Sequence, residues 1–280
     1  MIANQKIRYR TSLFWGGLRL HELNSEVEAG ADIICIDIED AVPLADKEKA
    51  RNAVLDFLKK YSPSNASQYI VRINPIDTKD GRDDLEALVH SPGFLSYLML
   101  PKIESVDAIK TVGQYLEDQN SSLNIFGIIE TAKGLELASQ IAVAHSRLKG
   151  FYFGGFDLSS AIGCEMDWEP LLYSRSKVVH AAALGEILAI DCPPALVDES
   201  TNQEKLIAYC NRSRALGMMG MVTKLSSQVR AMNKAFTPSD EEVSRARAIV
   251  EMYELDPTKP IVYQGKLIEL PMIKKLKQIL

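Results

Sequence analysis

Residues 150–163 read GFYFGGFDLSSAIG: an aromatic and apolar run ends at a single aspartate, Asp157, and a short helix-like segment follows. A continuous apolar run of this kind is typical of a strand that is covered on both faces. Aspartate is depleted in strands and is rarely buried without a partner for its charge. Taken alone, the stretch slightly favours Asp157 as the N-cap of a helix starting near residue 158 over Asp157 as part of a site.

The combination of a short apolar run and a helical pattern recurs along the chain. Amphipathic segments such as 46–60, 105–119 and 168–185 lie between the runs, with apolar residues at every third or fourth position. Alternating strands and helices predict the α/β class, and about eight pairs predict a (β/α)8 TIM barrel over residues 1–236. The alternative is a doubly wound sheet, but the chain has neither GxGxxG after the first run nor GxxxxGK(S/T) anywhere. The other apolar runs are TSLFWGG (11–17), DIICIDIED (32–40), YIVRINPI (69–76), YLMLPKI (97–103), LNIFGIIET (123–131), EILAIDCPPALV (186–197) and GMMGMVTKL (217–225).

A different pattern begins at residue 237. The segment FTPSDEEV (236–243) breaks a long helical stretch and predicts a new helix with Ser239 as N-cap, because Glu242 stands three residues later. After LDPTKP (255–260), the chain reads as a small hairpin or loop followed by a helix. We therefore expect residues 237–280 to form a C-terminal helical appendage with a lid-like tail.

Composition and charge exclude several classes of partner. The 280 residues are 46% hydrophobic and 25% charged, which is ordinary for a globular protein, and the net charge is −5. With a pI near 5.5 and no basic stripe, nucleic acid is not an expected ligand. No apolar run approaches the ~18 residues of a membrane span, and the N-terminus lacks a signal peptide's apolar core. These features predict a cytoplasmic protein, and the 4 scattered cysteines favour neither a zinc site nor disulfides.

Polar residues close several of the apolar runs. The carboxyl ends of the strands meet at one mouth in a barrel, so these residues are expected to converge there. Two close carboxylates, Glu130 and Asp157, repel unless one is protonated or a cation lies between them. A hard divalent cation such as Mg²⁺, which takes one or two carboxylates, resolves the repulsion. The residues at run ends are Asp37, Glu39, Asp40, Arg72, Asn74, Lys102, Glu130 and Asp157.

The cations at the run ends admit two interpretations. Arg72 has a planar guanidinium suited to a carboxylate or an enolate oxygen, but a structural ion pair with Glu39 or Asp40 is equally compatible with its position. Lys102 is similarly balanced between a structural ion pair at the rim and a substrate contact. No histidine closes a run, so a Ser-His-Asp triad has no support.

The motifs of the chain, in this order and spacing, resemble those of the citrate lyase β-subunit-like family within the HpcH/HpaI aldolase superfamily, which includes citryl-CoA and malyl-CoA lyases. The resemblance covers nearly the whole chain and implies a Mg²⁺-dependent (β/α)8 enzyme. It rests on R-T-S-L-F (10–14), D-I-E-D-A-V (37–42), K-x-x-A-R (47–51), V-R-I-N (71–74), L-P-K-I-E (100–104), I-I-E-T-A-x-G-L (128–135) and F-G-x-F-D-L-S (153–159).

The resemblance implies roles for individual residues. Glu130 and Asp157 match the metal-binding carboxylates, and Arg72 matches the arginine that steadies the substrate oxyanion. Members commonly form trimers or hexamers in which a C-terminal segment completes a neighbour's site. The substrate-binding residues expected here are Arg10, Asp37, Glu39, Asp40, Lys102, Gly154, Gly155 and Phe156.

Two departures from the family pattern bear on the chemistry. Many relatives carry G-K-x-x-I-H-P-x-Q near the thioester-binding cleft, whereas residues 220–228 read GMVTKLSSQ, which puts coenzyme A as the carrier in doubt. Relatives often read G-K-M-I-D-x-P near the end with the aspartate as acid/base, whereas residues 265–271 read GKLIELP and supply Glu269. The extra methylene moves the carboxylate by about 1 Å, and a misplacement of that order can cost ~10²-fold in rate.

The function that the resemblance implies is a Mg²⁺-dependent carbon–carbon lyase with Arg72 and Glu269 as catalytic residues. It cleaves or forms a 3-hydroxyacyl thioester such as citryl-CoA or malyl-CoA, giving an acyl-CoA and a 2-oxo acid. One alternative is a metal-dependent aldolase acting on free hydroxy-oxo acids. The other is a non-catalytic barrel that kept the metal site.

Overall fold

The computed structural model describes residues 9–23, 30–60, 68–91, 94–193, 202–257 and 259–280. These residues belong to two compact units, one within residues 1–236 and one within residues 237–280. The end of the apolar run predicted at 186–197 lies outside the described residues from position 194 onward. No described helix is both long and apolar enough to cross a membrane.

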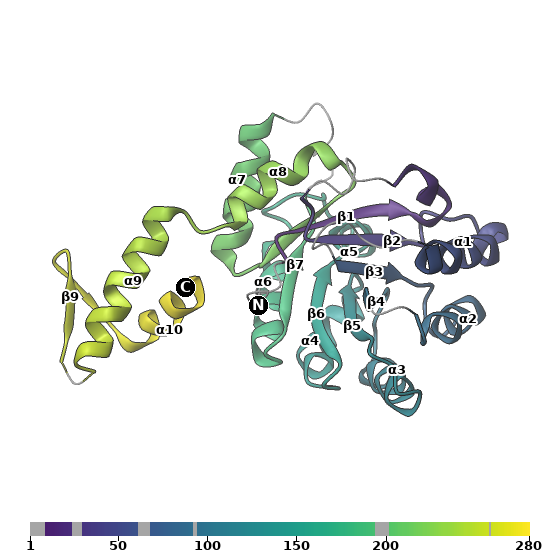
Figure 1. Ribbon diagram of the computed structural model, residues 1–280, viewed down its shortest axis with the longest axis horizontal. Helices are drawn as coiled ribbons and strands as arrows, with labels where there is room; N and C mark the ends of the chain where they lie inside the picture. Colours follow the sequence, from purple (N-terminus) through teal and green to yellow (C-terminus); the bar gives the residue numbers. More distant parts are fainter. Residues whose placement is uncertain (1–8, 24–29, 61–67, 92–93, 194–201, 258) are drawn as a thin grey trace. The chain divides into compact units, whose positions relative to one another are not determined.

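The first unit is a closed barrel of eight parallel strands in sequence order, with β8 paired to β1 (Figure 1). The predicted (β/α)8 TIM barrel is therefore confirmed. The register matters for the site, because Asp37 and Arg72 lie side by side at the carboxyl ends of neighbouring strands. The strands are β1 (Thr11–Gly16), β2 (Ile33–Asp37), β3 (Gln68–Arg72), β4 (Leu95–Leu100), β5 (Asn124–Ile129), β6 (Leu148–Phe153), β7 (Leu188–Asp191) and β8 (Gly220–Thr223).

Helices surround the barrel and bury its outer face (Figure 1). Four of them begin at a predictable polar residue: the side chains of Thr78, Ser105, Thr131 and Asn202 accept a backbone hydrogen bond from the first turn that follows. The helices are α1 (Lys47–Lys60), α2 (Lys79–Leu88), α3 (Val106–Asp118), α4 (Ala132–Ala142), α5 (Gly155–Ile162), α6 (Leu172–Leu184), α7 (Gln203–Leu216) and α8 (Ser226–Phe236), with short 3-10 turns η1 (Gly17–Glu22) and η2 (Leu44–Asp46).

Side chains fill the interior of the barrel. Aromatic rings stack edge to face there, with Phe126 4.9 Å from Tyr97 and 5.3 Å from Tyr152 between ring centroids. Cys35 packs among them as a fully buried small hydrophobe, as its position in the run 32–40 predicts. This packed interior closes the barrel below the polar residues at its carboxyl end.

The second unit has its own small core. It consists of α9 (Asp240–Leu255), an antiparallel hairpin of β9 (Ile261–Tyr263) and β10 (Lys266–Ile268), and α10 (Leu270–Ile279). Ser239 and Glu242 form the predicted capping box at the start of α9. The buried side chains that hold this unit together are Ile249, Ile261, Ile268 and Ile273.

Candidate active site

A pocket of about 550 Å³ opens at the carboxyl ends of the barrel strands. This is the end at which barrels of this type place their chemistry. Its wall is formed by residues at the carboxyl ends of strands or in the segments that follow them. The strands are β1, β2, β3, β5, β6, β7 and β8. Among the predicted site residues, the pocket is lined by Asp37, Asp40, Arg72, Glu130, Gly154, Phe156 and Asp157.

Glu130 follows β5 and is only 3% exposed. Its Oε1 accepts a hydrogen bond of 2.7 Å from the backbone N–H of Lys102. Burial raises the pKa of Glu130 to about 7; the Lys102 amide opposes this shift, and the nearby charge of Asp157 adds to it. Without a cation beside it, Glu130 is therefore partly protonated at neutral pH.

Gly154 makes room for the Glu130 side chain. A Cβ added at Gly154 would lie 2.3 Å from the Glu130 Cβ and 2.9 Å from its Oε2, which are closer than real atoms approach. The other two predicted residues of this segment differ from each other. Phe156 is 51% exposed and lines the pocket, whereas Gly155 is buried with Met166 beside it and is not among the described residues of the wall.

Asp157 does not end a strand, and it is not an N-cap. Strand β6 ends at Phe153, Gly154 is the N-cap, and Asp157 is the third residue of α5, so both expectations for its local structure are wrong. The physical reason is that the helix already begins at Gly155, and Gly154 and Gly155 leave no room for a Cβ beside Glu130 and Met166. In this first turn the Asp157 carboxylate is exposed, lines the pocket and acts electrostatically on Glu130.

Arg72 is held mainly by Asp37. Its Nε and Nη2 donate to the two carboxylate oxygens of Asp37 at 2.8 and 2.6 Å. Backbone N–H groups of Glu39 and Ala41 also donate to Asp37. Burial opposes the charge of Arg72, but the hydrogen-bonded Asp37 carboxylate raises the pKa of Arg72 further above its ordinary value. Asp37 is thus a structural partner of the arginine as well as a wall residue.

Glu39, Asp40 and Lys102 extend this ion-pair cluster. Arg72 Nη1 lies 3.1 Å from Glu39 Oε2 and 3.6 Å from Asp40 Oδ2, so the ion pairs considered from the sequence do form. Lys102 Nζ donates to Glu39 Oε1 at 2.8 Å. Neither Glu39 nor Lys102 is among the described wall residues, which favours the structural interpretation of Lys102. Burial raises the pKa of Glu39, and Arg72 and Lys102 oppose this shift.

The structure corrects the predicted role of Arg10. It precedes β1, and its Nε and Nη2 donate to Asp32 at 2.8 and 2.7 Å. This pair lies at the amino ends of the strands, the opposite end of the barrel from the pocket. The expected substrate contact of Arg10 is therefore wrong, because a residue that precedes a parallel strand cannot reach the carboxyl-end mouth.

Glu269 belongs to the second unit, where it is the N-cap residue of α10 and its side chain is exposed. Its predicted acid/base role stays a prediction.

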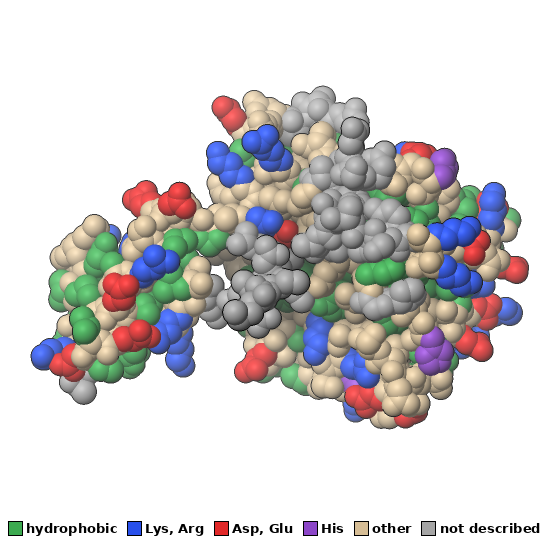
Figure 2. Space-filling model, in the orientation of Figure 1, with side chains coloured by type: hydrophobic (Ala, Val, Ile, Leu, Met, Phe, Trp, Pro, Cys, Tyr) green, Lys and Arg blue, Asp and Glu red, His purple; other side chains and the backbone are tan. Residues whose placement is uncertain are grey.

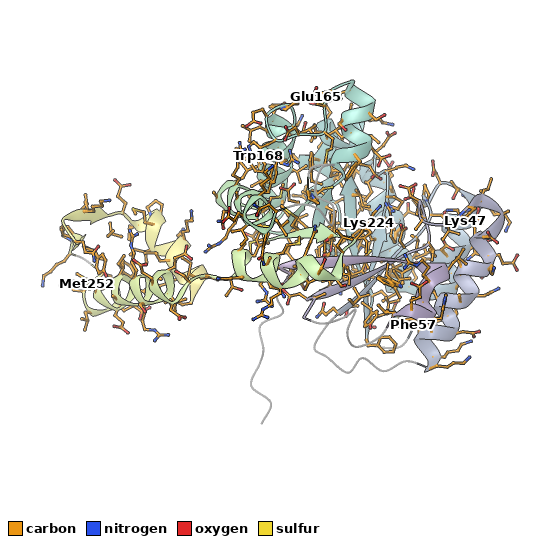
Figure 3. All side chains as sticks on the ribbon, turned by 90° about the horizontal axis from the view of Figure 1, so that it is seen from above. Lys47, Phe57, Glu165, Trp168, Lys224 and Met252 are labelled. Carbon is orange, nitrogen blue, oxygen red and sulfur yellow. The ribbon has the colours of Figure 1, made fainter. Side chains whose placement is uncertain are left out.

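The sequence interpretation missed the wall formed by β1, β7 and β8. Lys224 directly follows β8 (Figure 3), and reading the residue that closes each run would have found it in GMMGMVTKL. The aromatic residues Phe14 and Trp15 were hidden because they read as ordinary strand residues. The main wall residues of this group are Phe14, Trp15, Arg19, Cys192, Lys224 and Gln228.

The donor set fits a magnesium ion. No group of three or more His, Cys, Asp or Glu able to hold a metal occurs among the described residues, so a site made only of protein ligands is not built there. Glu130 and Asp157 provide the one or two carboxylates that Mg²⁺ takes, with water and substrate oxygens completing its octahedron. Five carboxylates around two cations, Arg72 and Lys102, also leave this cluster short of positive charge.

A (β/α)8 barrel with paired carboxylates and a fixed arginine at the carboxyl ends of its strands is the arrangement of a metal-dependent barrel enzyme. The chain belongs to the HpcH/HpaI aldolase/citrate lyase family, whose model matches residues 10–224. The family predicted from the motifs is thus confirmed.

Relatives of known activity match nearly the full chain. An L-malyl-CoA/β-methylmalyl-CoA lyase of Cereibacter sphaeroides is 28% identical, with 96% of this chain and 93% of that protein covered. A citrate lyase subunit beta of Leuconostoc mesenteroides is 26% identical over 99% of this chain and 93% of that protein. The crystal structure of CitE from Mycobacterium tuberculosis with magnesium, acetoacetate and coenzyme A matches with a TM-score of 0.78 and 26% identity over 97% of both chains.

Proposed function

We propose that this protein is a Mg²⁺-dependent carbon–carbon lyase that cleaves or forms a 3-hydroxyacyl-CoA thioester with a carboxylate on its hydroxyl carbon, such as malyl-CoA or citryl-CoA. The observation that carries the proposal is the shared pocket of Glu130, Asp157 and Arg72. The named relatives are lyases of such thioesters or citrate lyase subunits, and one solved relative holds both magnesium and coenzyme A.

Glu130 and Asp157 would hold the metal. When bound, Mg²⁺ supplies Lewis-acid stabilisation of the hydroxyl and carboxylate oxygens of the substrate. The Lys102 amide fixes Glu130 Oε1, and no hydrogen bond to Glu130 Oε2 occurs among the described residues. That oxygen, which faces the place where a Gly154 Cβ would lie, is available as a ligand.

Arg72 stabilises the charge that develops on the thioester. In cleavage, the bond between C2 and C3 breaks and its electron pair stays on C2, giving the acyl-CoA enolate. The hydroxyl loses its proton as C3 becomes the carbonyl of the 2-oxo acid, and C2 gains a proton. Asp37 holds one edge of the guanidinium, through Nε and Nη2, so the orientation of Arg72 is set before the substrate binds.

The proposal extends to Glu269 and the assembly. Glu269 donates the proton to C2, or removes it in synthesis, from the lid-like unit of a neighbouring subunit in a cytoplasmic homotrimer or hexamer. Glu269→Gln and Asp157→Ala chains should each be inactive alone. Co-expressed, they should recover part of the activity, because one mixed site then has both residues. No recovery in a mixed oligomer, with its size measured by light scattering, contradicts action between subunits.

Release of acetyl-CoA from malyl-CoA and citryl-CoA, with and without Mg²⁺, tests the activity. Wild type should cleave one of them only with Mg²⁺, and Asp157→Ala should abolish cleavage. Asp56→Ala is the control, because Asp56 is exposed on α1 away from the pocket wall. A wild type that binds Mg²⁺ but releases nothing contradicts the lyase assignment, and free hydroxy-oxo acids are then the substrates to assay.

A further inference from the structure

The carboxylates among the described wall residues of the pocket all lie on one side, together with Arg72. They are Asp37 at the end of β2 and Asp40, Glu130 and Asp157 in the segments after β2, β5 and β6. The wall formed by β1, β7 and β8 has no carboxylate among its described residues, and it includes two cations, Arg19 and Lys224. On the visible face of the barrel unit, by contrast, acidic and basic side chains are mixed (Figure 2). The separation therefore belongs to the pocket.

Lys224 differs from the other two cations of the pocket. Arg72 is paired with Asp37, and Arg19 is paired with Glu22. No described residue forms an ion pair or a hydrogen bond with the Lys224 ammonium. A pocket cation without an internal partner is available to an anionic group of the ligand.

The backbone around Lys224 is fixed. The hydroxyl of Thr223 accepts a hydrogen bond of 3.0 Å from the backbone N–H of Leu225 and donates one of 2.8 Å to Gln228 Oε1. The backbone N–H of Gln228 donates to the Leu225 carbonyl at 3.1 Å. Thr223 and Gln228 are both buried. Lys224 is thus presented from a turn that is held on both sides, as a pre-formed binding site requires.

Lys224 lies at the mouth of the barrel, whereas the preceding strand β8 belongs to its packed wall. Met221, the second residue of β8, is buried. Lys224 comes three residues later, after the end of β8. A charged residue at the carboxyl end of a barrel strand is typical of the active site and not of the core.

We propose that Lys224 is the centre of an anion subsite that binds an oxyanion group of the substrate remote from the metal-binding carboxylates. Apolar wall residues such as Val222 and Pro193 suit the uncharged part of the ligand beside it. The oxyanion is either a phosphate of the carrier or a second carboxylate of the acyl chain. The inference rests on the proposed function, because it assigns one end of that substrate to one wall of the pocket.

Direct binding measured by calorimetry tests the subsite. The probes are coenzyme A, 4′-phosphopantetheine and pantetheine, of which pantetheine lacks every phosphate and only coenzyme A carries adenosine. With Mg²⁺ present, oxaloacetate and pyruvate, which differ in one carboxylate, are the second set. The variants are Lys224→Gln, Lys224→Arg as the conservative rescue, and Lys110→Gln as the control, since Lys110 is exposed on α3 and is not among the described wall residues.

We expect Lys224→Gln to weaken binding of the charged probes of one set by at least ~10-fold and to leave the least charged member of that set unchanged. A loss shared by coenzyme A and 4′-phosphopantetheine but not by pantetheine identifies the carrier phosphate, and a loss confined to oxaloacetate identifies the acyl carboxylate. Equal affinities in Lys224→Gln, Lys110→Gln and wild type overturn the inference, as does a wild type that binds neither coenzyme A nor oxaloacetate. Metal-dependent cleavage that persists in such a case leaves the proposed function standing, so the two failures are distinguishable.

Discussion

The guanidinium of Arg72 and the carboxylate of Asp37 form a two-point ion pair across β2 and β3, with contacts of 2.8 and 2.6 Å. The strand register places the two residues directly opposite each other. Because Asp37 occupies Nε and Nη2, the third nitrogen, Nη1, is the one directed toward Glu39 and Asp40. The orientation of Arg72 is thus set before any ligand enters the pocket.

Arg72→Lys should lower kcat for thioester cleavage by about 10²–10³-fold, because a lysine keeps the charge but cannot make two parallel bonds to Asp37. Affinity for Mg²⁺ should change far less, since Arg72 is not one of the proposed ligands. Steady-state kinetics and calorimetry measure the two effects separately. Arg10→Lys is the matched control, because Arg10 makes the same kind of pair with Asp32 at the opposite end of the barrel. A similar loss of kcat in both variants would point to general disruption of the barrel.

Gly154→Ala should weaken Mg²⁺ binding strongly, by about tenfold or more, because the new Cβ would overlap Glu130. Glu130 can escape only by leaving its hydrogen bond to the Lys102 amide. Calorimetric titration with Mg²⁺ measures the effect, and circular dichroism verifies that the variant is folded. Unchanged Mg²⁺ affinity in a folded variant would show that Glu130 need not stay where the structure places it.

The barrel is predictable because one pattern is repeated. Eight apolar runs alternate with amphipathic segments, and each pair of run and segment predicts one strand and one helix. Most of the polar cluster could also be predicted, since Asp37, Arg72, Glu130 and Lys102 end a strand or follow one closely. The rule failed for Arg10, which a family motif had suggested although it precedes its strand. It failed for the local structure of Asp157 because the helix already begins at Gly155, inside an apolar stretch that reads as strand.

Contacts between distant residues were the least predictable part. The sequence allowed Arg72 to pair with Glu39 or Asp40, but only the register of β2 and β3 shows that Asp37 is its main partner. The Lys102 amide that holds Glu130 is equally invisible, because backbone groups carry no sequence signal. Lys224 was predictable, because it directly follows the last apolar strand of the barrel.

Glu130 should make the stability of the metal-free protein depend on pH. Its pKa is raised to about 7 in the folded state, against about 4.3 in an unfolded chain. Between these values the folded state binds more protons than the unfolded state, so the free energy of unfolding falls as pH rises from about 4.3 to 7. Glu130→Gln imitates the protonated form and should be the more stable protein at pH 8, by at most about 4 kcal/mol.

Urea unfolding of both proteins at pH 5 and pH 8, in EDTA, measures this difference. Added Mg²⁺ should stabilise wild type at pH 8 and have much less effect on Glu130→Gln, because a bound cation compensates the carboxylate charge. The affinity for Mg²⁺ should also decrease below pH 7, since the ion competes with a proton for Glu130. A wild type that loses no stability relative to Glu130→Gln on going from pH 5 to pH 8 would contradict the raised pKa.

Two substitutions of Lys102 should distinguish the role of its backbone from the role of its side chain. Its φ of 52° is left-handed, a conformation that costs a non-glycine residue about 1 kcal/mol. Lys102→Gly removes that cost and keeps the amide that holds Glu130, so this variant should retain Mg²⁺ affinity. Lys102→Ala loses the same ammonium contact to Glu39 but keeps the strained backbone, and should be the less stable of the two by about 1 kcal/mol in urea unfolding.

Both variants should lose activity to a similar extent, because both leave Glu39 without its lysine and disturb the carboxylates around Arg72. If Lys102→Ala proves as stable as Lys102→Gly, residue 102 does not hold the left-handed conformation in solution.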